Sequence, residues 1–232
     1  MTATPALLTP HGFVAALQAG LAAHANPAHA VAMAAYIRGQ FAFAGVKAPQ
    51  RRLISTPLIR AARVQFAASD YLHTAELLWQ LPEREYQIAA VDLLADRPAL
   101  LGAAALPVIE QLITAKAWWD SVDGLAGSVV GPLVGTHPDL IAIMDGWAAG
   151  ERLWDKRTAI LHQLGYKHAT DSERLFRYCT DNAAHPDFFI RKAIGWALRQ
   201  YARTDAAAVR SFLERERHSL SPLSLREAAK HL

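Results

Sequence analysis

The sequence has a single cysteine, Cys179, among 232 residues. One cysteine permits neither an internal disulfide framework nor a thiolate metal cluster, and it favours a reducing compartment. No uninterrupted apolar run approaches about 18 residues, so no membrane span is expected. The N-terminal residues MTATPALLTPHGF lack the charged start and the long apolar run of a signal peptide. We therefore expect a cytoplasmic protein with no membrane partner.

Strand signals and common catalytic motifs are also scarce. Period-two alternation and clusters of Val, Ile and Thr are nearly absent, which argues against a sheet. The chain has no HExxH motif, no Gly-rich phosphate loop and no GxSxG elbow. Its ten histidines do not show metal-ligand spacing. The sequence thus predicts an all-α protein that uses no metal and no other cofactor.

The bulk composition is that of a folded, mildly basic protein. Hydrophobic residues make up 52% of the chain and charged residues 19%, which is enough to build a core. The net charge is +3, which is compatible with a polyanionic partner but does not by itself identify one.

Prolines divide the chain into helical segments, because proline suits the first position of a helix. Their positions and the apolar periodicity predict thirteen helices with short links, and hence one domain over residues 1–232. The helices are expected near 9–24, 27–42, 49–67, 70–80, 82–96, 98–114, 117–134, 137–149, 151–165, 171–183, 186–203, 205–217 and 222–231.

The most informative residues recur at nearly regular intervals. Trp119, Arg157 and Trp196 are 38 and 39 residues apart, which is the scale of a helical repeat. Residues on the same face of every second helix of a solenoid line one concave surface. No consensus motif recurs, so the repeat rests on helix spacing alone.

The segment DFFIRKAIGWALRQY, residues 187–201, forms a clear amphipathic helix on a helical wheel. Trp196 lies at the rim of its apolar half. Lys192, Arg199 and Arg203 share the adjoining polar face. A large aromatic beside a row of cations is typical of stacking on a flat ligand or of phosphate binding. Lys192 could also be a Schiff-base nucleophile, but its cationic neighbours favour phosphate binding.

A second tryptophan, Trp119, is followed one helical turn later by an acidic residue. In WWDSVD, residues 118–123, Trp119 lies at the border of the apolar stripe and Asp123 follows one turn later on the same surface. The alternative is that Trp118 and Trp119 are both core residues and Asp123 is a solvated helix acid.

Arg157, in RLWDKRTAIL, falls within the apolar arc of its helix. An inward-facing arginine needs an acidic partner or a route to solvent. Two interpretations follow: a structural pair with an aspartate, or a side chain that reaches past its packed stem to grip an anion.

VKAPQRR, residues 46–52, places Lys47, Arg51 and Arg52 at a helix start. Cations oppose the helix dipole there, so a bound phosphate is one interpretation and a solvated basic turn is the other.

Taken in order, VKAPQRR, WWDSVD, LWDKRTAIL, FFIRKAIGWALRQY and LSPLSLREAAKHL closely resemble the AlkD family of DNA alkylation repair glycosylases. The resemblance extends from about Asn26 to the end of the chain. It implies a right-handed solenoid of HEAT-like antiparallel helix pairs with a concave, positively charged face that binds double-stranded DNA. It also implies a monomer near the bacterial nucleoid.

Matched residue by residue, the resemblance implies that Asp123, Trp119, Trp196 and Arg157 are catalytic. The implied DNA-binding residues are Tyr36, Lys47, Arg51, Arg52, Lys156, Lys167, Phe188, Arg191, Lys192 and Arg199. Leu225 stands where the family often has a basic residue, which affects only a peripheral contact.

The implied chemistry is hydrolysis of the N-glycosidic bond of cationic N3- and N7-alkylated purines, with Arg157 holding a flanking phosphate. A cationic base leaves as a neutral molecule, so no general acid is needed and one carboxylate suffices. Two other hypotheses stay open: a non-catalytic DNA-binding solenoid and a protein-binding HEAT scaffold.

Overall fold

The computed structural model describes residues 7–232, and all regular structure in that range is helical. The all-α prediction is therefore confirmed. The helices group into two compact units, Met1–Val108 and Ile109–Leu232. No helix in the described range is long and apolar enough to cross a membrane.

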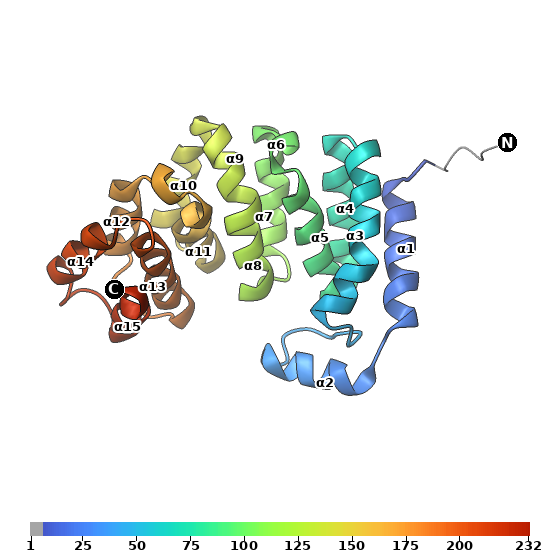
Figure 1. Ribbon diagram of the computed structural model, residues 1–232, viewed down its shortest axis with the longest axis horizontal. Helices are drawn as coiled ribbons and strands as arrows, with labels where there is room; N and C mark the ends of the chain where they lie inside the picture. The colour runs from blue at the N-terminus through green and yellow to red at the C-terminus, as the bar shows by residue number, and fades with distance from the viewer. Residues whose placement is uncertain (1–6) are drawn as a thin grey trace. The chain divides into compact units, whose positions relative to one another are not determined.

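The first unit is a layer of packed helices. Helix α1 packs against α3 and α4, and α5 packs against the same two helices (Figure 1). Its core includes the fully buried Phe13, Leu17, Tyr71 and Leu78. The elements are α1 (Pro10–Ala23), α2 (Pro27–Tyr36), α3 (Ala48–Gln65), α4 (Ala68–Gln80), α5 (Arg84–Asp96), α6 (Pro98–Leu101), η1 (Ala103–Ala105) and α7 (Leu106–Thr114), which continues into the second unit.

Helix α2 is shorter than predicted and has no buried residue. The sequence predicted a helix over 27–42, which is wrong at its C-terminal end. Arg38 and Gly39 have φ values of 60° and 71°, which an α-helix cannot contain. The loop that follows is held by the Glu85 carboxylate, which accepts hydrogen bonds from three successive backbone N–H groups, those of residues 44–46, at 2.9–3.0 Å.

The second unit contains the helices that carry most of the candidate site. The elements are α8 (Trp119–Leu125), the π-helical segment η2 (Ala126–Val130), α9 (Gly131–Thr136), η3 (Pro138–Leu140), α10 (Ile141–Ala149), α11 (Leu153–Leu161), η4 (His162–Gly165), η5 (Lys167–Ala169), α12 (Ser172–Asp181), α13 (Phe188–Ala202), α14 (Ala206–Arg215), α15 (Pro222–Ala228) and η6 (Ala229–His231). The predicted helices in this unit are all present, several of them divided into shorter pieces.

Side-chain caps explain why several of these helices begin where they do. Asp171, Asp187, Asp205 and Ser221 each accept a hydrogen bond from a backbone N–H in the first turn of the following helix. These residues satisfy N–H groups that have no partner inside the helix. The helix that carries Trp196 is therefore fixed at its start by Asp187.

The three motif-bearing helices of this unit are neighbours, since α11 packs against both α8 and α13. Arg157 contacts Asp123, and Tyr166, further along the chain, contacts Gly131. From the first contact to the second, the residue numbers increase in both segments. The α8–η2–α9 stretch and the α11–η4 stretch therefore run parallel. Parallel neighbours at this spacing are typical of stacked helix pairs. The right-handed solenoid and its concave face stay predictions.

Candidate active site

Asp123 and Arg157 form a buried two-point ion pair. The Nε and Nη2 atoms of Arg157 donate to the Oδ1 and Oδ2 atoms of Asp123 at 2.7 and 2.8 Å. The side chains are 15% and 4% exposed. The remaining nitrogen, Nη1, donates to the Phe189 carbonyl oxygen. All three nitrogens of the guanidinium are therefore engaged within the protein.

This pairing supports the structural interpretation of Arg157. The arginine faces inward as its wheel position predicts, and an aspartate is its partner. Arg157 fixes the carboxylate of Asp123 in one orientation. The expected contact of Arg157 with a flanking phosphate stays a prediction.

The surroundings of Asp123 act on its charge in opposite directions. Burial raises the pKa of the Asp123 carboxyl, the guanidinium of Arg157 counteracts that rise, and the nearby Asp120 adds to it. The two charge-assisted bonds from Arg157 favour the ionised form of this carboxyl. In that form the site holds a negative charge that water solvates only weakly.

An aromatic cluster lies beside Arg157. The ring centroids of Trp118, Trp154 and Phe189 are 5.0 to 5.9 Å apart, and the guanidinium of Arg157 lies 5.9 Å from the Phe189 ring. Trp118 precedes α8 as its N-cap residue instead of lying within the helix as predicted. The cluster thus places an apolar surface beside the guanidinium of Arg157, where a lower local dielectric strengthens its electrostatic interactions.

Asp123 also lines an open groove of about 330 Å³. Trp196 lies on the same groove, so the structure brings together the acid of one motif and the tryptophan of another. Trp119 is half-buried at the start of α8, one helical turn before Asp123. The other lining residues are Gly127, Ser128, Leu164, Gly165 and Gln200, none of which the sequence had indicated.

Two cations of the basic row beside Trp196 share one acid that the sequence did not reveal. Glu227 pairs with Lys192 at 2.8 Å, with Arg199 at 2.9 Å and with Lys230 at 2.7 Å. Hydrogen bonds from Lys192 and Lys230 lower the pKa of Glu227 to about 2. Three cations around one carboxylate leave the cluster positive, which still suits a phosphate.

Two of the predicted DNA-binding cations are buried and have internal partners. The Nζ of Lys156 donates to the Ala148 carbonyl at 3.0 Å and to the Asn182 side chain at 2.5 Å. Arg51 pairs with Asp92 at 3.1 Å and its side chain is 6% exposed. A phosphate contact by either residue does not fit this burial, and we assign both a structural role.

The other candidates lie closer to solvent. Arg191 is half-buried and its Nε donates to the His185 carbonyl at 2.8 Å. Tyr36 and Phe188 are 74% and 48% exposed. The exposed candidates are Tyr36, Lys47, Arg52, Lys167 and Phe188.

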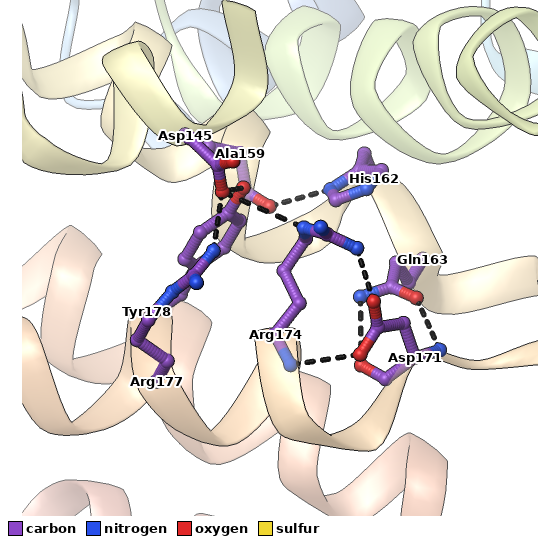
Figure 2. Close-up of polar contacts among 8 residues, drawn as sticks. All are labelled: Asp145, Ala159, His162, Gln163, Asp171, Arg174, Arg177 and Tyr178. Atoms are coloured by element: carbon purple, nitrogen blue, oxygen red, sulfur yellow. Dashed lines mark hydrogen bonds and ion pairs between the residues drawn. The ribbon is translucent and has the colours of Figure 1, made fainter. Parts of the chain in front are cut away.

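A second polar cluster, on α10, α11 and α12, is structural in character. Figure 2 shows Asp145 accepting from Tyr178 and Arg177, with Arg174 between Asp145 and Asp171. The buried His162 directs Nδ1 to the Ala159 carbonyl. The charged groups of the cluster pair with one another. In residues 7–232 no cluster of His, Cys, Asp and Glu has the make-up of a metal site.

Comparisons with known proteins agree with this geometry. A family profile described as DNA alkylation repair enzyme matches residues 17–232. The structure is similar to that of a protein described as a predicted DNA alkylation repair enzyme from Enterococcus faecalis, with a TM-score of 0.82 and 33% identity, over 90% of this chain and 96% of that one. No curated protein sequence matches the chain.

Proposed function

Because the chain belongs to the family of DNA alkylation repair enzymes, we propose that it is a glycosylase. It hydrolyses the N-glycosidic bond of cationic N3- and N7-alkylated purines in double-stranded DNA. The observation that carries this proposal is the weakly solvated carboxylate of Asp123, which lies on a groove that also contains Trp196.

The chemistry follows from the charge of the substrate. The C1′–N bond breaks with its electron pair moving to the cationic purine, which leaves as a neutral base and needs no proton. Positive charge then develops on the sugar, and the Asp123 carboxylate stabilises it. A water molecule attacks C1′, and Asp123 orients it and accepts its proton before releasing it to solvent.

The tryptophans assist by packing. Trp196 presents a large aromatic surface to the groove, and the π face of an indole attracts the developing cation. Trp119, one turn before Asp123, extends this wall. Arg157 holds the Asp123 carboxylate in position.

The strand itself is held by the accessible cations. Arg52, Lys167 and the cluster around Glu227 supply positive charge that binds backbone phosphates without reading sequence. Such a protein acts as a monomer on nucleoid DNA in the cytoplasm. Phosphate binding of this kind predicts an affinity that decreases steeply with salt concentration.

The test is release of free 7-methylguanine and 3-methyladenine from methylated duplex DNA, measured for the wild type and for Asp123→Asn. The asparagine keeps the size of the side chain but removes its charge. We expect release to fall by about 100-fold or more, which is the scale of losing one preorganised electrostatic group. DNA affinity should change by less than about threefold, because the strand is held chiefly through its phosphates.

The exposed Asp139→Asn is the matched control, and it should release base at the wild-type rate. Unchanged release by Asp123→Asn would refute the assigned mechanism. Salt-dependent DNA binding without any base release by the wild type would instead favour the non-catalytic DNA-binding protein.

A further inference from the structure

The helix that carries Asp123 changes its winding one residue after α8 ends. In η2 the N–H of Gly131 donates to the carbonyl of Ala126, five residues back instead of four. The chain then resumes α-helical winding in α9. Single π turns inside helices occur frequently at functional sites.

Pro132 accounts for this change. A proline inside a helix has no N–H to donate, and its ring crowds the carbonyl four residues back. The N–H of Gly131 goes to Ala126, so the Gly127 carbonyl loses the donor that α winding would give it. In π winding its donor would be position 132, which is a proline, so the Gly127 carbonyl is left without a helical donor.

The π turn is held by specific contacts. The hydroxyl of Tyr166 donates to the Gly131 carbonyl at 2.6 Å. A Cβ atom at Gly131 would lie 2.2 Å from the carbonyl oxygen of His162, so only glycine allows the two backbones to approach. These contacts join the helix of Asp123 to the segment that follows Arg157, and they keep the unusual winding in place.

The position of the turn relates it to the candidate active site. Gly127, whose carbonyl has no helical donor, lines the same groove as Asp123 and Trp196. Within the described chain, none of the residues that line this groove is a lysine, arginine or histidine. A backbone carbonyl without its helical donor carries an uncompensated partial negative charge.

We propose that the Gly127 carbonyl, freed by Pro132 in the π turn, is a second negatively polarised group of the groove that favours a positively charged nucleotide. The inference rests on the proposed function and deepens it, since it concerns what the same groove selects. Asp123 and the carbonyl together line the groove with negative potential. A neutral nucleotide of equal shape gains less from this wall than a cationic one.

The experiment compares two duplexes that differ at one position. One contains a pyrrolidine abasic analogue, which is cationic, and the other contains the neutral tetrahydrofuran analogue. The readout is the ratio of their dissociation constants for the wild type and for Pro132→Ala. Alanine supplies an N–H that can bond the freed carbonyl. We expect the preference for the cationic duplex to fall by about tenfold, the scale of one hydrogen-bonding group acting on a charge.

Pro57→Ala is the matched control, because Pro57 also lies inside a helix, α3, and does not line the groove. It should leave the ratio unchanged. In the Pro132→Ala variant, hydrogen exchange of the new backbone amide reports whether this N–H has found its acceptor. Protection of that amide together with a lowered ratio supports the proposal, whereas protection with an unchanged ratio overturns it.

A new amide that exchanges without protection would contradict the assignment of the freed carbonyl. Base release from methylated DNA is measured in parallel. A wild type that shows the charge preference but releases no base refutes the glycosylase and leaves the carbonyl as a binding determinant. A wild type that releases base with no charge preference refutes this inference alone.

Discussion

Arg157 lies 34 residues beyond Asp123 in the chain, and its guanidinium meets both oxygens of that carboxylate, at 2.7 and 2.8 Å. The pair joins α11 to α8 inside the second unit. It both orients the acid and maintains its charge, so the properties of Asp123 depend on a residue from another helix.

Arg157→Met tests this dependence. Without its cation the buried carboxylate has a still higher pKa, since burial disfavours the charged form. The acid limb of the pH–rate profile for base release therefore moves to higher pH, and release at pH 7 falls by roughly 100-fold. Arg157→Lys keeps the charge but cannot donate in two parallel bonds, so its release should lie between those of the wild type and Arg157→Met. An unshifted acid limb in a folded Arg157→Met protein would contradict the prediction.

Substitution of Lys156 is expected to change stability alone, and substitution of Lys167 is expected to change DNA binding alone. Lys156→Met leaves the Asn182 side chain and the Ala148 carbonyl without a buried donor and destabilises the protein by about 2 kcal/mol. It should not change the salt dependence of DNA binding. Lys167→Gln, at an exposed position, lowers that slope by about 1 without loss of stability. Urea denaturation and DNA titrations at several salt concentrations measure both, and a slope change in Lys156→Met would restore it as a phosphate contact.

The buried His162 is expected to make the protein less stable in mildly acidic solution. Burial lowers the pKa of His162 to about 4 from an ordinary 6.5, while its bond to Ala159 and the nearby Asp145 and Asp171 oppose that shift and Arg174 adds to it. As the pH falls the unfolded chain takes up the proton first. Stability is therefore complete above about pH 6.5 and decreases towards pH 4, by up to roughly 3 kcal/mol.

Urea midpoints between pH 4 and 7 measure this loss. His162→Gln removes the titrating group and should flatten the curve in that window. The exposed His168→Gln serves as the control and keeps the wild-type slope. A slope unchanged in His162→Gln would assign the acid sensitivity to another group.

Glu227 acts in a lower pH window. Its pKa falls to about 2 from an ordinary 4.5, chiefly through hydrogen bonds from Lys192 and Lys230. The stability that it contributes is present above about pH 4.5 and is lost as the pH falls towards 2. Glu227→Gln should remove this part of the acid transition, as measured by thermal unfolding between pH 2 and 5. Exposed Glu214→Gln should leave the transition as it is.

Alanine substitution is expected to change the stability in opposite directions at two glycines. Gly131→Ala places a Cβ 2.2 Å from the carbonyl of His162 and should destabilise the protein by about 2–3 kcal/mol. Gly146, within α10, has no atom within 4 Å of such a Cβ, so Gly146→Ala should stabilise by about 0.5–1 kcal/mol. Chemical denaturation distinguishes the two, and equal effects would contradict the close approach at Gly131.

The sequence by itself determined the helices and the faces on which the key residues lie. Asn26 before Pro27 and Asp187 before α13 mark helix starts, because capping depends on atoms within one turn. Helical periodicity likewise placed Arg157 inward and Trp196 at a rim. The motif order added the family, which structure and comparison then confirmed.

Only the tertiary structure decided which charges meet. Periodicity orients a side chain on its own helix but does not say what the neighbouring helix presents to it. Asp123 as the partner of Arg157, and Glu227 within the basic row, depend on how helices remote in sequence pack together. The same packing buried Lys156 and joined the π turn of the Asp123 helix to Tyr166. Local sequence therefore fixes which groups each helix can offer, and packing determines which of them become a site.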